Sequence, residues 1–176
     1  WIPNNPVLKR EGYKDSKINT LKYLNQLSQG QSTDELIETF ASEGPNMVKF
    51  LEANSSLKWR VSKIMGEASE YHPDWPGSVL KGRSIEPDVS GVKPGILLGG
   101  HLISHLIQSI YSLGGKLITN CPAKRLISRE LEDGTREVLG VSCLRKNKEF
   151  LIKARRGILL SSGGFDHNLE MKKHFL

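Results

Sequence analysis

The sequence predicts an α/β protein, α+β in its local character, with a helical first half and a three-stranded β-meander in the second half. Apolar residues recur at helical spacing through most of the first 51 residues. Three strand-length segments separated by short turns follow between residues 123 and 154. With 176 residues, 38% of them hydrophobic, the chain can enclose one ordinary core, so we expect a single domain.

The first two predicted helices have recognisable start and stop signals. The first follows Asp15-Ser16 and ends at Gly30, a residue type favoured after the last helical turn. Its repeating apolar residues are Ile18, Leu21, Leu24 and Leu27. The second opens at Ser32 with Glu35 three residues later, which is the capping-box pattern. Its predicted buried stripe consists of Leu36, Ile37, Phe40 and Ala41.

A proline predicts the start of a third helix. Gly44-Pro45 interrupts the helical pattern, and proline is tolerated best in the first turn of a helix. We therefore expect a new helix to begin at Pro45. Its apolar residues would be Met47, Val48, Phe50 and Leu51.

Residues 56–100 are the segment in which we first expect function. Prolines and glycines are dense there and leave little room for regular elements. They are Pro73, Pro76, Pro87, Pro94, Gly66, Gly77, Gly82, Gly91, Gly95, Gly99 and Gly100. A long irregular segment in a compact domain usually wraps a ligand, covers a site or contacts another domain.

The second half predicts a helix followed by strands. One continuous helical face is made by Leu102, Ile103, Leu106, Ile107, Ile110 and Leu113. Gly114-Gly115 ends this helix before a short strand at 116–119, and the meander strands follow at 123–131, 137–145 and 148–154. The apolar run 157–161 is typical of a buried strand in a parallel sheet.

Ser162, Gly163 and Gly164 follow that last strand. A glycine pair between a strand and a helix allows backbone N–H groups to approach a phosphate or cofactor closely. A tight turn that needs positive φ explains the same pair equally well. The residues alone leave both interpretations open.

Charge and cysteine content limit the partners and the location. The net charge of +6 is dispersed and lacks interleaved aromatic residues, so we expect no nucleic-acid partner. No apolar run is long enough for a transmembrane segment. Cys121 and Cys143 match no metal or redox motif, so we expect free, buried thiols and a cytoplasmic location, with membrane association as the alternative. The five histidines, His72, His101, His105, His167 and His174, predict no metal site.

The ending of the chain carries a resemblance to a known family. Residues 158–171 read ILLSSGGFDHNLEM, which resembles the VILATGGF-x-x-N-x-E-M segment of the fumarate reductase flavoprotein family. The preceding elements occur in the same order as in that family. They are the helix, Gly114-Gly115, the strand beginning at Ala123, the turn at Asp133-Gly134 and the strand at 152–159.

The first half resembles one branch of the same family. Residues 1–6 read WIPNNP, and residues 71–77 read YHPDWPG before GRSIEP at 82–87. Both segments are similar to the 3-ketosteroid Δ1-dehydrogenase branch. The resemblance implies that residues 1–176 are an internal portion of one Rossmann-like FAD-binding domain. The N-terminal dinucleotide fingerprint, the substrate domain and the C-terminal segment would then be missing, and the chain by itself would be inactive.

The resemblance also implies a reaction and candidate site residues. The reaction is 1,2-dehydrogenation of a 3-ketosteroid or a related enone, with FAD as cofactor and an unknown electron acceptor. Tyr71 would support a tyrosine base that removes the C2 proton, while the hydride leaves C1 for flavin N5. The FAD-binding residues would be Asn4, Asn5, Ala123, Ser162, Gly163 and Gly164.

Other interpretations remain open at this point. Tyr71 could be a half-buried aromatic residue beside Pro73, and Asn4 and Asn5 could be ordinary turn residues. The protein could be another flavin-dependent enzyme of the superfamily, acting on a dicarboxylate or another enone. It could also be a non-catalytic interaction domain that retains the fold.

Overall fold

The computed structural model describes residues 1–62, 70–81, 83–91 and 98–175. The chain divides into two compact units, Trp1–Leu117 and Ile118–Leu176, which are described separately below. Within the segment 56–100, residues 63–69, 82 and 92–97 lie outside the described residues, and with them four of its prolines and glycines, Gly66, Gly82, Pro94 and Gly95. The assignment of all 176 residues to one domain stays a prediction.

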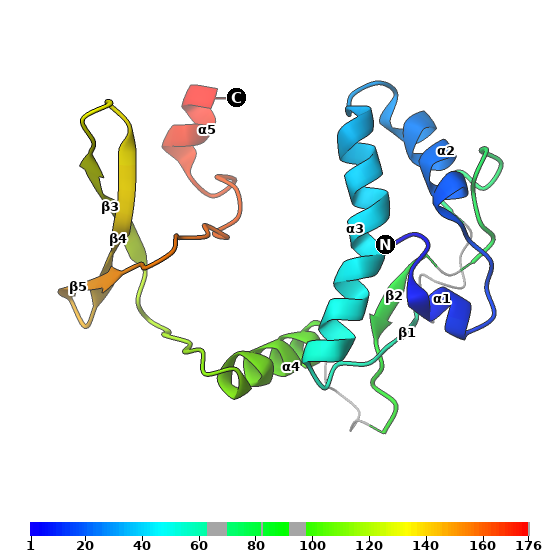
Figure 1. Ribbon diagram of the computed structural model, residues 1–176, viewed down its shortest axis with the longest axis horizontal. Coiled ribbons are helices and arrows are strands. Elements are labelled where there is room, and N and C mark those ends of the chain that lie inside the picture. The colour runs from blue at the N-terminus through cyan, green and yellow to red at the C-terminus, as the bar shows by residue number, and fades with distance from the viewer. Residues whose placement is uncertain (63–69, 82, 92–97, 176) are drawn as a thin grey trace. The chain divides into compact units, whose positions relative to one another are not determined.

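The N-terminal unit combines helices with one small sheet (Figure 1). Its helices are α1 (Pro6–Arg10), α2 (Lys17–Ser28), α3 (Asp34–Asn54) and α4 (Leu98–Ser112). Strands β1 (Trp59–Val61) and β2 (Ile85–Pro87) pair antiparallel, with Arg60 opposite Glu86. Most of the described part of residues 56–91 outside this pair is irregular, as the dense prolines and glycines predicted.

Helix α2 confirms its predicted position but buries a different face. The Ser16 side chain accepts a hydrogen bond from Asn19 N–H at the start, and Gln29 adopts the left-handed conformation at the end. The buried side chains are Thr20 and Tyr23, whereas Ile18 and Leu27 of the predicted apolar set are exposed.

Helix α3 differs from the prediction in its cap, its buried stripe and its length. The N-cap is Thr33, whose hydroxyl accepts from Leu36 N–H, and not Ser32. Ile37 and Ala41 are buried as predicted, but Leu36 and Phe40 are exposed. Adjacent helical residues differ by about 100° in direction, so the one face that packs inward excludes two of the four predicted residues.

The predicted helix break at Pro45 is wrong, because α3 continues through this residue. Pro45 is buried on the same face as Ala41 and Val48, at spacings of four and three residues. Proline inside a helix costs about 3 kcal/mol through a lost hydrogen bond and a clash with the preceding turn. Packing of this continuous face therefore outweighs the local preference for a break.

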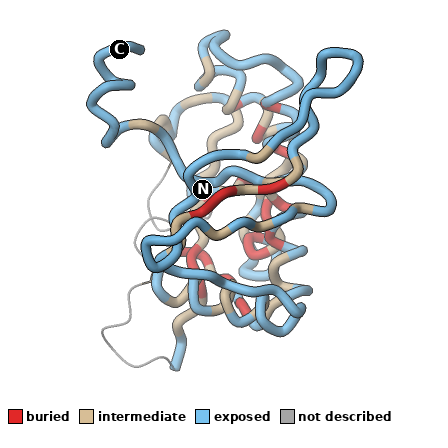
Figure 2. Tube along the Cα trace, turned by 90° about the vertical axis from the view of Figure 1, so that its left-hand side faces the viewer, coloured by how far each residue is buried: buried red, intermediate tan, exposed pale blue. Residues whose placement is uncertain are grey.

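The core of the N-terminal unit joins α1, α3 and β1. It consists of Val7, Leu8, Val48, Leu57, Trp59 and Val61. Ile85 from β2 and Leu102 from α4 pack against its edge. Figure 2 shows the buried positions as short separated stretches, not whole elements. The core is thus small and depends on each element contributing one or two side chains.

The C-terminal unit contains the predicted meander. Strands β3 (Ala123–Glu130), β4 (Arg136–Arg145) and β5 (Lys148–Lys153) form an antiparallel sheet in the order β3-β4-β5. Lys146 and Asn147 both have positive φ in the two-residue turn between β4 and β5, which matches the twist of a hairpin. These observations confirm the three predicted strands and the Lys146-Asn147 turn.

Two other predicted strands are absent from the described residues. Neither 116–119 nor 157–161 is a strand, and Leu159 is 90% exposed. An extended segment becomes a strand only beside a hydrogen-bonding neighbour, and neither segment has one in the described structure. The chain then reaches α5 (Leu169–Phe175), where the Asn168 side chain accepts from Met171 N–H at 3.0 Å.

Two further observations bear on the thiols and on membranes. Both cysteines are free, with Cys143 buried and Cys121 only partly buried, so the prediction of two buried thiols is half right. Burial, followed by contact with the Cys121 thiol, raises the pKa of Cys143. Across the described residues, no helix combines the length and apolar character needed to span a bilayer.

Candidate functional site

The most extensive buried polar network of the described residues is centred on Arg83. Its side chain is 1% exposed, as is that of Asp15. Arg83 Nε donates to Asp15 Oδ2 at 2.9 Å and Nη2 donates to Asp15 Oδ1 at 2.8 Å, which is a bidentate pair. Nη2 also donates to the Gly77 carbonyl at 2.8 Å. Arg83 therefore connects the start of α2 to the loop that contains Gly77.

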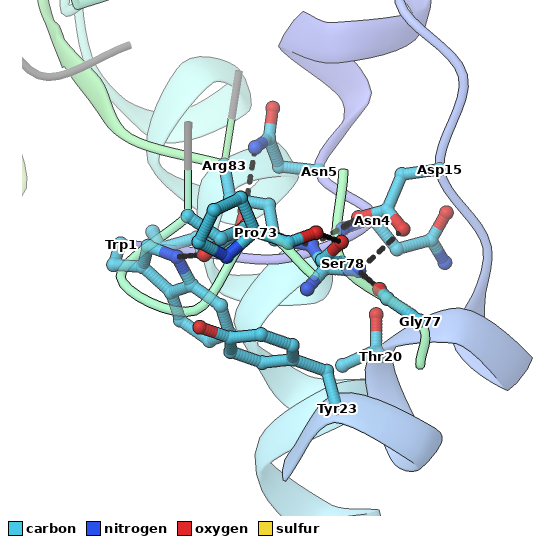
Figure 3. A network of polar contacts seen from close by, with 12 residues as sticks. Trp1, Asn4, Asn5, Asp15, Thr20, Tyr23, Pro73, Gly77, Ser78 and Arg83 are labelled. Atoms are coloured by element: carbon cyan, nitrogen blue, oxygen red, sulfur yellow. Dashed lines mark hydrogen bonds and ion pairs between the residues drawn. The ribbon is translucent and has the colours of Figure 1, made fainter. Parts of the chain in front are cut away.

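Aromatic rings enclose the same guanidinium. Its carbon lies 5.4 Å from the ring centroids of both Trp1 and Tyr23, within the range of cation–π attraction. Figure 3 shows labelled residues from the N-terminal segment, from α2 and from the loop at 73–78 gathered around this point. Three segments distant in sequence thus meet at one buried charge.

The N-terminal segment is attached to this network by its backbone. Asn4 N–H donates to Asp15 Oδ2 at 2.7 Å, and Ile2 N–H donates to the Arg83 carbonyl at 2.7 Å. Asn4 has a φ of 50°, a left-handed conformation that asparagine tolerates better than most residues. The conformation of residues 1–5 is therefore fixed by Asp15 and Arg83.

Glu70 brings a second buried carboxyl group to the network. Its side chain is 6% exposed, and its Oε1 lies 3.5 Å from Arg83 Nε. Its Oε2 accepts a hydrogen bond from Trp1 Nε1 at 2.9 Å. Burial raises the pKa of Glu70 above its ordinary value, and this effect outweighs the opposing hydrogen bond from Trp1 and the charge of Arg83.

The raised pKa of Glu70 predicts a pH dependence of stability. At a pH between the ordinary value and the raised value, the folded protein keeps a proton that the unfolded chain has released. The contribution of Glu70 to stability therefore falls as the pH rises above its ordinary pKa of about 4.5. In Glu70→Gln this loss should disappear, because glutamine can still accept from Trp1 but does not titrate.

The measurement is the urea midpoint of both proteins between pH 4 and pH 7. We expect the difference between Glu70→Gln and the unsubstituted chain to shift in favour of the variant as the pH rises. Parallel profiles for the two proteins would show that Glu70 titrates alike in the folded and unfolded states, contrary to the burial seen here.

Tyr71 lies next to this network and faces solvent. It is 87% exposed, so the alternative of a half-buried aromatic residue beside Pro73 is wrong. Its ring meets His72 edge to face at 4.7 Å. His72 in turn stacks on Trp75 at 3.7 Å, and His72 N–H donates to the Tyr23 hydroxyl oxygen at 3.2 Å. The backbone next to Tyr71 is therefore anchored while its hydroxyl is available to a partner.

Asn5 has a structural role that sequence reasoning did not identify. It is 0% exposed and forms the N-cap of α1. Its Oδ1 accepts from Leu8 N–H at 3.0 Å, and its Nδ2 donates to the Ile2 carbonyl at 2.6 Å. Because the Asn5 side chain is already paired, Asn5 would contact a cofactor only through its backbone. Cofactor binding by Asn4 and Asn5 stays a prediction.

The remaining predicted site residues belong to the C-terminal unit. Ala123 is the exposed first residue of β3, opposite Cys143 of β4. Ser162, Gly163 and Gly164 lie in an exposed loop before α5. Gly163 has a φ of 78°, and a Cβ atom added to it would meet nothing within 4 Å. Gly164 has no positive φ, and a Cβ atom added to it would lie 3.2 Å from Asp166 Oδ2. The positive φ of Gly163 agrees with the tight-turn interpretation, and cofactor binding by Ser162, Gly163 and Gly164 stays a prediction.

Sequence reasoning missed the charged residues that organise the site. Asp15 served only as part of a helix-start signal and Arg83 only as part of a resemblance motif, yet they form the buried ion pair. A buried Arg needs a buried carboxylate, but a separation of 68 residues gives no local signal. Glu70 gave no signal of its own.

The described residues form helices and two small antiparallel sheets, and the fold class is mixed α/β. The chain belongs to the FAD binding domain family, whose model matches residues 1–175. The cofactor of this family is FAD.

Curated relatives point to one branch of flavoproteins. The chain is 28% identical to the 3-oxosteroid 1-dehydrogenase of Mycolicibacterium smegmatis in an alignment that covers 98% of this chain and 40% of the relative. It is 33% identical to the 3-oxosteroid 1-dehydrogenase of Comamonas testosteroni over 137 residues, covering 76% of this chain and 22% of the relative. The chain thus spans well under half the length of these relatives.

Solved structures show the same fold. The 3-ketosteroid Δ1-dehydrogenase of Sterolibacterium denitrificans, in complex with 1,4-androstadiene-3,17-dione, matches with a TM-score of 0.81 at 22% identity. The match covers 99% of this chain and 41% of that one. The 3-ketosteroid Δ4-(5α)-dehydrogenase of Rhodococcus jostii RHA1 matches with a TM-score of 0.72 at 20% identity, covering 98% and 38%. At these identities the likeness establishes the fold alone.

Proposed function

We propose that the complete protein is an FAD-dependent oxidoreductase that 1,2-dehydrogenates 3-ketosteroids. The observation that carries this proposal is the similarity to a 3-oxosteroid 1-dehydrogenase along 98% of the chain. Residues 1–176 would be an internal part of its FAD-binding domain, and the dinucleotide fingerprint and the substrate domain would belong to the rest of the protein. The electron acceptor is not specified by these residues.

The proposed reaction converts the C1–C2 single bond of the steroid into a double bond. The C2 proton goes to a tyrosine base, and the hydride leaves C1. FAD supplies the hydride acceptor when it is bound. The protein must therefore hold the steroid near the cofactor and stabilise the deprotonated base, because a tyrosine hydroxyl ordinarily has a pKa near about 10.

Tyr71 would supply that stabilisation. Its exposed hydroxyl is free to donate a hydrogen bond to a tyrosine oxygen from another part of the protein, and a hydrogen bond to the charged form favours that form. The stack of His72 on Trp75 and the Arg83 network would keep Tyr71 in place. In the C-terminal unit, the backbone of Ala123 and of Ser162, Gly163 and Gly164 would contact the adenosine and pyrophosphate portions of FAD.

Replacing Tyr71 with phenylalanine tests this role. A hydrogen bond to a charged group is worth about 1.5–3 kcal/mol, so turnover in the complete enzyme should fall roughly 10- to 100-fold. The FAD content, measured from flavin absorbance, should not change. Tyr111→Phe is a matched control because Tyr111 is also exposed but lies on α4. An unaltered rate in Tyr71→Phe would remove Tyr71 from the site.

A second candidate acts on a smaller ring ketone. The chain is 28% identical to the 4-oxocyclohexanecarboxylate 2-dehydrogenase of Sinomonas cyclohexanicum over 92 residues, covering 52% of this chain and 16% of the relative. That similarity covers only half of the chain, so the steroid assignment is favoured.

Flavin absorbance separates the candidates. In the complete protein without oxygen, the flavin should bleach on addition of a 3-ketosteroid and should not bleach on addition of 4-oxocyclohexanecarboxylate. Once reduced, the flavin should not be reoxidised by fumarate. Bleaching by the cyclohexanone acid alone would favour the second candidate. Absence of bound flavin would remove both and favour a non-catalytic interaction domain.

A further inference from the structure

Two histidines of α4 face each other one helical turn apart. His101 and His105 are separated by four residues, which places them on the same side of the helix. Their Nε2 atoms are 3.1 Å apart, and the ring centroids are 4.4 Å apart. Both side chains are partly exposed. The two ring nitrogens thus converge on a point that solvent can reach.

A serine from the end of α3 orients one of the rings. Ser56 Oγ lies 2.6 Å from His105 Nδ1 and follows α3 by two residues. If His105 carries its proton on Nδ1, the serine oxygen accepts it, and the unprotonated Nε2 accepts the 3.1 Å hydrogen bond from His101 Nε2–H. A metal ion bound by both Nε2 atoms would replace that proton. A hydrogen bond of this kind to the second ring nitrogen is the usual support of a metal-binding histidine.

The distance between the two Nε2 atoms matches a shared metal ion. Bonds of about 2.0–2.1 Å from each nitrogen to zinc would meet at an angle of roughly 95–100° when the nitrogens are this far apart. That angle lies between the square-planar value preferred by Cu²⁺ and the tetrahedral value preferred by Zn²⁺. Calcium and magnesium prefer oxygen ligands and would not be bound by two imidazoles.

We propose that His101 and His105 form a chelating site for a late transition-metal dication, with Ser56 orienting His105. Within the described residues, no group of three or more His, Cys, Asp and Glu side chains could hold a metal. Water would complete the coordination around these two ligands. Because both ligands lie on α4, a bound ion would link two successive turns of this helix and stabilise it.

This site is independent of the proposed dehydrogenase activity. It uses none of the residues assigned to FAD or to the steroid. Imidazole binds metal only in its neutral form, so acidification should release the ion. Affinity should follow the general order for nitrogen ligands, with Cu²⁺ bound more tightly than Ni²⁺ or Zn²⁺ and Mn²⁺ bound most weakly.

The test is titration of the complete, tag-free protein with CuCl₂ or ZnCl₂ in competition with a colorimetric chelator. We expect one ion per chain and loss of at least tenfold in affinity in His101→Gln and in His105→Gln. Ser56→Ala should weaken binding by roughly 10-fold or more. His167→Gln and His174→Gln remove histidines of the C-terminal unit and should bind as the unsubstituted protein does.

Electron paramagnetic resonance gives an independent readout. The Cu²⁺ complex should show hyperfine coupling to two imidazole nitrogens, and to fewer in either single variant. Far-UV circular dichroism checks that the variants remain folded, and the partial exposure of both side chains makes their loss tolerable. Unchanged affinity in His101→Gln, or equal loss in His167→Gln, would overturn the proposal.

Discussion

Replacing Arg83 with leucine is expected to lower the free energy of unfolding by about 3–5 kcal/mol. The guanidinium is buried, and its removal leaves the carboxylate of Asp15 and the carboxyl of Glu70 without their cationic partner. It also removes the donor to the Gly77 carbonyl and the cation between Trp1 and Tyr23. A loss of this size is a large fraction of the stability of an ordinary domain.

The matched control is Arg129→Leu. Arg129 donates to Glu137 at 2.7 Å, but both side chains are largely exposed. Exposed ion pairs typically contribute about 0–1 kcal/mol, so this variant should be nearly neutral. Urea unfolding of Arg83→Leu is followed by tryptophan fluorescence, because Trp1, Trp59 and Trp75 all lie in the N-terminal unit. Unfolding of Arg129→Leu is followed by far-UV circular dichroism, because Arg129 lies in the C-terminal unit. Equal midpoints for Arg83→Leu and the unsubstituted chain would show that the buried network does not stabilise the unit.

One polar atom of Arg83 has no hydrogen-bond partner among the residues that the structure describes. Nη1 is buried and makes no hydrogen bond, whereas Nε and Nη2 are both paired. A buried donor without an acceptor costs about 1–3 kcal/mol. The network as a whole therefore stabilises less than its individual contacts suggest, which fits the general finding that buried ion pairs fix geometry more reliably than they add stability.

Local signals in the sequence predicted the secondary structure well where an element is self-contained. Helix α2, helix α4 and the three meander strands are short-range structures whose caps, turns and periodicity are written in neighbouring residues. The predictions failed where the outcome depends on a neighbour. The segment 157–161 has the composition of a buried parallel strand, but only an adjacent strand could make it one.

The buried face of each helix was harder to predict than the helix itself. In α2 the apolar residues Ile18 and Leu27 are exposed, while Tyr23 and Thr20 are buried beside the Arg83 network. Hydrophobic periodicity assumes that apolar side chains face the interior. Here a charged pair from distant segments occupies part of that interior, so polar-tipped side chains face it instead.

The candidate site shows the same division. The positive φ of Gly163 could be predicted because this conformation is a local property of glycine. The positioning of Tyr71 could not, since it depends on an ion pair between residues 15 and 83 and on the stack of His72 against Trp75. The spacing of His101 and His105 was a local signal that single-residue reasoning overlooked.

Replacing Gly77 with alanine is expected to destabilise the chain by about 2–5 kcal/mol. Gly77 has a φ of 80°, where an L-residue costs about 1–2 kcal/mol. A Cβ atom would also lie 2.1 Å from the Asn19 carbonyl oxygen and 3.0 Å from Lys22 Cβ, both on α2. Overpacking of this kind adds about 1–3 kcal/mol, because backbone must move to relieve it.

The comparison with Gly12→Ala separates the two contributions. Gly12 has a φ of 84°, but an added Cβ would meet nothing within 4 Å. It should therefore show only the conformational cost of about 1–2 kcal/mol. The additional loss of unfolding free energy in Gly77→Ala measures how closely the loop at 73–78 must approach α2.

In the complete enzyme, Gly77→Ala should also lower turnover. The Gly77 carbonyl, which accepts a hydrogen bond from Arg83 Nη2, would be displaced together with the backbone that carries Tyr71. Equal urea midpoints for the two alanine variants would show that the loop can move away from α2 at no cost, and the network would then not hold Tyr71 in place.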